Sequence, residues 1–284
     1  MGRNTEAGMP FAAVLVATID IMGVTKPQLT TPPSAPRALL CIHGSGGSAN
    51  IFRVQTAKLR MALRHEFEFV YATAPFESEP GPGVLPLFRG MGPYRSWFLK
   101  DDSDKNTRVN RANDEEMPSA ETSSVGGRLL AVNKPVQKAV ENWQKNNPQI
   151  PIVGVIAFSE GALVAALLIW QQQMGRLPWF PKMDVAMFIC CYYTEEATDY
   201  IKTESPDDQK SILIDVPSVH LQGLQDFALQ GSRKLAATHF SPQNTDILEF
   251  QGGHHIPSRK SDIDEAARRF LNLYKNRKPK ALNA

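Results

Sequence analysis

Cysteine is scarce in this 284-residue sequence, which has three: Cys41, Cys190 and Cys191. All three lie in apolar runs and two are adjacent, which argues against a disulfide framework and fits a reducing compartment. We therefore expect a cytoplasmic protein. The cysteines and the six histidines show no spacing typical of a metal site, so we expect neither a metal nor a cofactor.

An excess of charge of either sign is also missing. The sequence has 31 Lys and Arg against 29 Asp and Glu, which leaves +2 and gives no sign of a nucleic-acid groove. The apolar run Met9 to Met22 is interrupted by Asp20, has no basic start and is too short to cross a bilayer. We expect no nucleic-acid partner and no membrane partner.

Apolar residues make up 42 % of the sequence, which is enough for a sizeable core. Strand patterns alternate with helix patterns from Arg37 to Tyr274, as in a mostly parallel sheet covered by helices on both faces. There is no internal repeat, so one domain over 37–274 is the simplest interpretation. Residues 1–36 are expected to form an arm or edge strand with a linker, and 275–284 a basic, flexible tail.

The sequence A-F-S-E-G at 157–161 stands between an apolar segment, Ile150 to Ile156, and a helical one, Ala162 to Gln173. A serine in a tight strand-to-helix turn, with small residues two positions away on each side, is the nucleophile-elbow pattern. The small residues here are Ala157 and Gly161. The alternative is an ordinary turn in which Ser159 caps the helix.

A glycine-rich turn, H-G-S-G-G at 43–47, follows the apolar run Arg37 to Ile42. No Gly-Lys-Ser/Thr follows it, so it is not a phosphate loop. In an α/β-hydrolase such a turn supplies a backbone N–H to the oxyanion hole, which here would be that of Ser45. The N–H of Glu160 would be the second donor, with its side chain pointing away along the start of the helix. The alternative is a plain strand-to-helix turn.

Serine-based acyl transfer also needs an imidazole base and a carboxylate that orients it. In α/β-hydrolases the order along the chain is Ser, then Asp or Glu, then His. Asp226 follows the predicted strand Ser218 to Gly223, and His254 follows the predicted strand Asp246 to Phe250. His255 is a close competitor of His254 that spacing alone does not exclude.

Three other histidines receive different predictions. His43 lies in the glycine-rich turn and is expected to be structural, His220 lies within a strand and is expected in the core, and His239 follows a helix and is expected at the surface.

The stretch 76–124 is too long for a bare connection in a compact domain, so we predict a cap or lid. Its Gly and Pro forbid a regular core element, yet it carries aromatic residues. We predict that Trp97, Phe88 and Phe98 bind an acyl chain; the alternative is that Trp97 packs in the core.

The motifs L-L-C-I-H-G-S-G-G-S, E-F-V-Y-A-T-A-P-F, A-F-S-E-G-A and G-G-H-H-I-P together resemble the fungal serine hydrolase (FSH-type) family, which includes LovG-like thioesterases that release polyketides from their synthases. The resemblance covers about Arg37 to Tyr274 and implies an α/β-hydrolase fold with a Ser-Asp-His triad. The family motif G-G-H-x-x-P selects His254. The usual elbow, G-F-S-Q-G, differs here at Ala157 and Glu160.

These features predict a serine hydrolase that cleaves an acyl ester or acyl-carrier thioester through an acyl-enzyme. The resemblance implies release or deacylation of a polyketide in fungal secondary metabolism, with a polyketide synthase as the partner. Two alternatives stay open. One is an acyltransferase that moves an acyl group from a carrier-protein thioester to an alcohol, and the other is a non-catalytic binding protein on a hydrolase scaffold.

Overall fold

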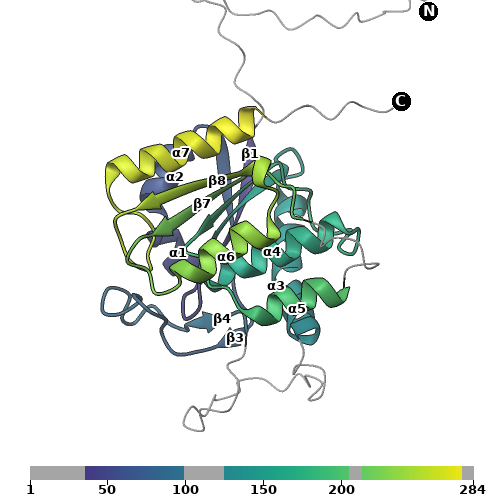
Figure 1. Cartoon of the computed structure of the whole chain (residues 1–284), viewed down its shortest axis with the longest axis horizontal. Helices are drawn as coiled ribbons and strands as arrows, with labels where there is room; N and C mark the ends of the chain where they lie inside the picture. Colours follow the sequence, from purple (N-terminus) through teal and green to yellow (C-terminus); the bar gives the residue numbers. More distant parts are fainter. Residues whose placement is uncertain (1–35, 99–124, 205–212, 277–284) are drawn as a thin grey trace, which may run out of the picture. The chain divides into compact units, whose positions relative to one another are not determined.

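The computed structural model of the chain describes residues 36–98, 125–204 and 213–276 (Figure 1). The N-terminal arm or edge strand predicted within residues 1–36, residues 99–124 of the predicted cap and the predicted tail from residue 277 lie outside these ranges. Within the described residues, no helix combines the length and the apolar character needed to span a bilayer.

A six-stranded sheet forms the centre of the described part, and all its neighbouring strands are parallel. This confirms the predicted α/β-hydrolase fold class. In spatial order the strands are β2 (Phe67–Ala72), β1 (Arg37–Ile42), β5 (Ile152–Phe158), β6 (Val185–Ile189), β7 (Ser218–Gly223) and β8 (Thr245–Phe250).

The position of each strand in the sheet explains its sequence pattern. Every residue of β5 and β6 is buried, because both strands lie at the centre with a helical layer on each face. The edge strands β2 and β8 mix buried and exposed residues instead. Continuous apolar runs therefore mark the middle of this sheet.

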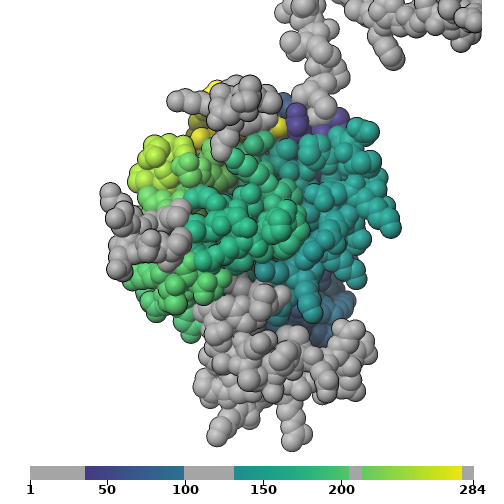
Figure 2. All heavy atoms as spheres, turned by 90° about the vertical axis from the view of Figure 1, so that its right-hand side faces the viewer, coloured from purple at the N-terminus to yellow at the C-terminus, as the bar shows by residue number. Residues whose placement is uncertain are grey.

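Helices cover both faces of the sheet and divide the apolar core into two clusters. One layer consists of α1 (Ala49–Gln55), α2 (Ala57–Leu63) and α7 (Lys260–Lys275). The other consists of α3 (Val125–Asn146), α4 (Glu160–Gln173), α5 (Glu195–Glu204) and α6 (Leu229–His239). Figure 2 shows an outer surface of the second layer, where side chains of its helices lie together in teal and green. A short 3-10 turn, η1 (Pro242–Asn244), precedes β8.

Helix α4 is buried from Glu160 to Gln171, including all its Ala, Leu and Val residues. A helix that is apolar on all sides needs neighbours on all sides, and here β1, β5 and α3 pack against it. Its first residue follows Ser159 directly. The sheet and the helical layer therefore hold both ends of the turn that contains this serine.

The described part of the predicted cap, up to Phe98, contains the short antiparallel pair β3 (Phe76–Glu77) and β4 (Arg95–Ser96). Between these strands, Val84 and Phe88 pack against Ile51 of α1. This segment, 76–96, is thus attached to the body of the domain through a small apolar cluster of its own.

Candidate active site

Ser159 adopts a backbone conformation that non-glycine residues rarely take, with φ of 55° and ψ of −123°. Its N–H donates to the carbonyl of Ile189 (2.9 Å), and its carbonyl accepts from the N–H of Tyr192 (3.2 Å). The last residue of β6 and the chain directly after it thus hold the peptide groups on both sides of the serine Cα. This fixes the strained turn between β5 and α4.

Gly161 is required by a close approach between two parts of the chain. A Cβ at this position would lie 2.2 Å from the carbonyl oxygen of His43 and 2.7 Å from that of Ile42. Ala157, on the other side of the serine, is fully buried and fits with its methyl group. The small residues of the predicted elbow therefore let the end of β1 lie against the start of α4.

His254 lies between Ser159 and Asp226. Its Nε2 is 2.7 Å from Ser159 Oγ, and its Nδ1 is 2.8 Å from Asp226 Oδ1. The three side chains follow β5, β7 and β8, so all come from the carboxyl-terminal edge of the sheet. Because Nδ1–H donates to the carboxylate, Nε2 is left to accept the proton of the serine hydroxyl.

The Asp226 carboxyl is fixed by a second donor, the N–H of Ala228, which lies 2.7 Å from Oδ1. Burial on its own would raise the pKa of Asp226. Hydrogen bonds donated by His254 and by Ala228 outweigh burial, so the pKa lies below its ordinary value. An ionised carboxylate can therefore face the imidazole at neutral pH.

The ring of His255 makes a different set of contacts. Its Nδ1–H donates to the carbonyl of Ile256 (2.9 Å), its Nε2 accepts from the N–H of Gly253 (3.3 Å), and it packs against Phe250. Of the two neighbouring histidines, the structure thus brings His254 to the serine.

The glycine-rich turn after β1 lies beside the serine, since a Cβ on Gly44 would be 3.0 Å from that of Ser159. Segment 76–96 holds the turn from the other side. Ser45 Oγ is 2.5 Å from Ser96 Oγ, and the carbonyl of Gly47 accepts from the N–H of Arg95 (2.8 Å). The turn and the first residue of α4, Glu160, therefore flank Ser159, as the predicted oxyanion donors require.

A family model described as serine hydrolase (FSH1) matches residues 33–266, more than half of the chain. The chain belongs to the FSH1 serine hydrolase family. It is similar to the esterase mlcF of Penicillium citrinum, with 59 % identity over 85 % of this chain and 92 % of the relative. It is also similar to the dihydromonacolin L-[lovastatin nonaketide synthase] thioesterase of Aspergillus terreus (strain NIH 2624), with 51 % identity over 84 % of this chain and 93 % of that protein.

Among solved structures, the chain is similar to a carboxylesterase from Bacillus cereus. The match covers 85 % of this chain and 90 % of the carboxylesterase chain, with 14 % sequence identity and a TM-score of 0.48.

Two of the remaining histidines of this FSH1 hydrolase lie where the sequence predicts. His43 is buried, its Nδ1–H donates to the carbonyl of Gly44 (2.7 Å), and its Nε2 accepts from the N–H of Ala74 (3.1 Å). Burial lowers its pKa to about 4, so it is neutral at physiological pH. His220 is buried on β7 and stacks on Phe188.

The prediction for His239 is wrong, because this side chain is buried. Its Nε2 lies 2.9 Å from the hydroxyl of Tyr193 and 3.0 Å from that of Thr198. It joins the end of α6 to the start of α5.

The side chain of Glu160 does not extend away from the site, which corrects another prediction. It is buried, and its Oε2 accepts from the backbone N–H of Trp97 at 2.8 Å. Glu160 therefore ties the start of α4 to the chain directly after segment 76–96. Sequence spacing gives no signal for this bond, because its partners are 63 residues apart.

Trp97 is fully buried in the FSH1 hydrolase, and its Nε1 donates to the carbonyl of His43 at 2.7 Å. Phe88 is buried against α1, and Phe98 is partly buried against the core. In this structure Trp97 and Phe88 offer almost no exposed surface to an acyl chain. The predicted acyl contacts of these two residues are thus replaced by packing contacts, the alternative weighed for Trp97.

Trp97→Ala should destabilise the domain by about 3–5 kcal/mol, the usual loss for truncating a buried large aromatic side chain. The variant also leaves the carbonyl of His43 without its indole donor. Chemical denaturation monitored by circular dichroism measures the free energy of unfolding.

Trp143→Ala is the matched control. This indole is half-buried on α3 and also donates to a carbonyl, that of Ile150. Trp143→Ala should lower the free energy of unfolding clearly less than Trp97→Ala does. Equal losses for the two variants would show that Trp97 does not contribute more to core packing than a half-buried tryptophan.

Phe227 is the site residue that sequence reasoning missed. Its side chain is 65 % exposed, and its ring centroid lies 4.4 Å from that of His254. On the inner side the same imidazole packs against Phe158, at 5.1 Å. The available signal was its position, directly after Asp226 at the edge of the sheet where open α/β folds bind ligands.

Proposed function

We propose that this FSH1 hydrolase cleaves an acyl ester or thioester with Ser159 as nucleophile, His254 as base and Asp226 as the group that orients the base. One observation supports this assignment above all. The unbroken line of short contacts from Ser159 Oγ through both ring nitrogens of His254 to Asp226 is the geometry that activates a serine.

In the first half-reaction, Ser159 Oγ attacks the acyl carbonyl carbon while its proton passes to His254 Nε2. Asp226 stabilises the resulting imidazolium. The negative charge moves to the carbonyl oxygen, where the N–H groups of Ser45 and Glu160 are the proposed donors. The tetrahedral intermediate then expels the alcohol or thiol, which leaves with the proton from His254.

In the second half-reaction, water takes the place of the leaving group. His254 removes a proton from the water as its oxygen attacks the acyl-enzyme carbonyl, and returns that proton to Ser159 Oγ as the ester bond breaks. The products are a carboxylic acid and the free enzyme.

For the substrate, we propose a polyketide acyl group carried as a thioester, with a polyketide synthase as the partner. This rests on a relative, since the Aspergillus terreus protein that is 51 % identical is named as a thioesterase of lovastatin nonaketide synthase. The coarser statement, a serine hydrolase with a small-molecule acyl substrate, does not depend on that choice.

A fluorophosphonate probe tests the proposal, because it phosphonylates only an activated serine. The probe should label the wild-type protein, and peptide mass spectrometry should locate the label on Ser159. Acyl-N-acetylcysteamine thioesters should then be hydrolysed, with the free acid as product. An unlabelled protein would instead support a binding role, and an ester formed with an added alcohol would reveal acyl transfer.

Phe227→Ala should reduce kcat/KM on long acyl chains by roughly tenfold or more and leave short chains nearly unchanged. The reason is apolar contact, since burying one CH₂ is worth about 0.8 kcal/mol and the exposed ring lies beside the base. A chain-length series of p-nitrophenyl esters measures the effect.

Ile247→Ala is the control, because Ile247 is an exposed apolar residue on the edge strand β8. This variant should change kcat/KM on neither the long nor the short acyl chains. An equal loss on short and long chains would assign Phe227 to the support of His254 rather than to the acyl chain.

A further inference from the structure

Cys190 shares an unusual backbone conformation with the nucleophile. In the described part of the chain, Ser159 and Cys190 are the two non-glycine residues with positive φ, 55° and 47°. Such strain persists only where surrounding contacts impose it, and it gathers at functional sites. Here the N–H of Cys190 donates to the carbonyl of Leu221 on β7 (2.9 Å). The residue therefore has a fixed position directly after β6.

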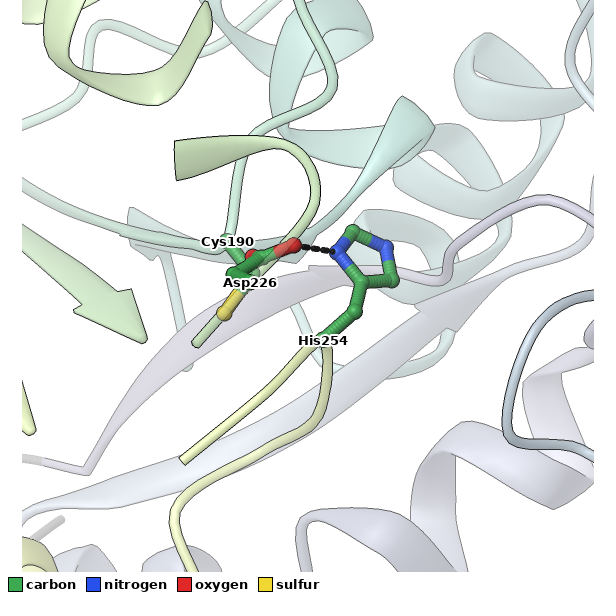
Figure 3. A group of neighbouring side chains, drawn as sticks. All are labelled: Cys190, Asp226 and His254. Carbon is green, nitrogen blue, oxygen red and sulfur yellow. Dashed lines mark hydrogen bonds and ion pairs between the residues drawn. The ribbon is translucent and has the colours of Figure 1, made fainter. Parts of the chain in front are cut away.

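The thiol of Cys190 faces the loops that hold the acid and the base. Its Sγ is 3.8 Å from the carbonyl oxygen of Gly253 and 3.6 Å from that of His255, the two neighbours of His254. It also lies within 4.8 Å of a carboxylate oxygen of Asp226 and a ring nitrogen of His254. Figure 3 shows the Cys190 side chain beside Asp226, on the side away from the imidazole.

The three residues offer atoms of the types that bind metals. However, His254 Nδ1 and Asp226 Oδ1 are already hydrogen-bonded to each other. Burial raises the pKa of the Cys190 thiol, so the sulfur keeps its proton at neutral pH. The group is thus better described as an acid–base pair with a neighbouring hydrogen-bond donor.

The carboxylate of Asp226 has an oxygen that needs such a donor. Its Oδ1 accepts from both His254 and Ala228, whereas Oδ2 is buried without a hydrogen-bond partner of regular geometry in the described part. The side chain is 1 % exposed, so water does not readily supply the missing bond. A buried carboxylate oxygen without a donor is unfavourable.

We propose that the thiol of Cys190 donates its hydrogen to Oδ2 of Asp226 and thereby acts as a positioning residue for His254. The inference rests on the proposed function of Ser159, Asp226 and His254. A charged carboxylate is a stronger acceptor than the two carbonyls near the sulfur. The distances from Sγ to both carbonyl oxygens are long for a thiol hydrogen bond. With Oδ2 held, rotation of the carboxylate is restricted and Oδ1 stays directed at Nδ1. The pKa of Asp226 lies below its ordinary value, and the neighbouring Cys190 thiol is the smallest of the causes that lower it, after His254 and Ala228.

The test compares Cys190→Ala, which has no donor, with Cys190→Ser, which has one. The titratable groups that face this carboxylate are His254 after β8 and Cys190 and Cys191 after β6. Without the thiol donor, the carboxylate becomes more basic and favours the imidazolium. Cys190→Ala should therefore lower kcat roughly tenfold at unchanged KM and move the acidic limb of the kcat/KM profile to higher pH. Cys190→Ser should restore the wild-type kcat and the wild-type position of the acidic limb.

All rates are expressed per fluorophosphonate-titrated site, so that misfolded protein does not count. Proton NMR gives a second readout, because the downfield resonance of the His254–Asp226 hydrogen bond should shift in Cys190→Ala and return in Cys190→Ser. Cys41→Ala is the matched control, since it truncates another buried thiol, on β1, whose hydrogen bond goes to Leu39. It should leave rate, profile and resonance unchanged.

Wild-type kcat, profile and resonance in Cys190→Ala would overturn the inference, and so would a Cys190→Ser variant that behaves like Cys190→Ala. If Cys190→Ala yields no protein that the fluorophosphonate labels, the test rests on Cys190→Ser. In that case, a pH profile of kcat/KM in Cys190→Ser that differs from that of the wild type overturns the inference. If the Cys190 variants overturn the inference while Ser159→Ala is inactive, the proposed function is retained. An active Ser159→Ala would instead contradict the proposed function itself.

Discussion

Ser159→Ala should lower turnover by several orders of magnitude, on the order of 10⁴–10⁶, because removing a triad nucleophile leaves only binding and oxyanion stabilisation. The fold should survive. Alanine keeps the Cβ of serine, so the backbone strain at φ of 55° is unchanged. The bonds that hold the turn come from the backbone at Ile189 and Tyr192 and do not use the serine hydroxyl.

Thioester hydrolysis and thermal melting should be measured on the same preparation. Ser218→Ala is the matched control, because Ser218 is also a buried serine whose Oγ lies near a histidine nitrogen, 3.1 Å from His220 Nε2. It should keep most of its activity. If purified Ser159→Ala retains more than a few per cent of wild-type turnover, the nucleophile is another residue.

His254→Ala should be inactive to a similar degree, and His255→Ala should keep most of its activity. The reason is that one imidazole alone spans the serine and the acid, with contacts of 2.7 and 2.8 Å. The ring of His255 is engaged by its own loop, at Gly253 and Ile256. Single-turnover acylation by a p-nitrophenyl ester separates the two variants.

The double variant Ser159→Ala/His254→Ala provides a further check, since residues that act as one unit are non-additive. It should be no slower than either single variant. Activity in His254→Ala together with its loss in His255→Ala would move the base by one residue and change the register of the loop after β8.

The sequence was sufficient to predict the residues that meet at the site, because their order along the chain and their positions after strands are local features. Ser159, Asp226 and His254 each follow an apolar run, and parallel strands bring the ends of such runs to one edge. The contacts in the structure distinguish His254 from His255, because only the ring of His254 contacts both Ser159 and Asp226 in the described part. The spacing of residues alone leaves both histidines as candidates.

What could not be predicted depends on partners distant in the sequence. An aromatic residue in a Gly- and Pro-rich stretch looks the same whether it lines a pocket or fills the core. Trp97 fills the core because the carbonyl of His43 and the carboxylate of Glu160 meet it there. The burial of His239 likewise depends on Tyr193 and Thr198.

Element boundaries show the limits of propensity. Apolar residues recur at helical spacing from Ala49 to Leu63, and the structure divides this stretch into two helices, with a break at Thr56. The hydroxyl of Thr56 donates to the carbonyl of Phe52 at 2.6 Å. The backbone N–H of Thr56 donates to the same carbonyl (2.9 Å), so the hydroxyl shares this acceptor. Bonds of this kind often bend helices, and the periodicity of apolar residues does not record them.

The wide separation of the proposed nucleophile and base along the chain has a consequence for synthesis. Ser159 and His254 are 95 residues apart, and the base enters only after β8, the last strand of the sheet. Pairings between distant segments make a parallel sheet slow to fold. A growing chain that has already exposed the serine elbow therefore has no base beside it. We expect the protein to be inactive on the ribosome until nearly the whole domain has emerged.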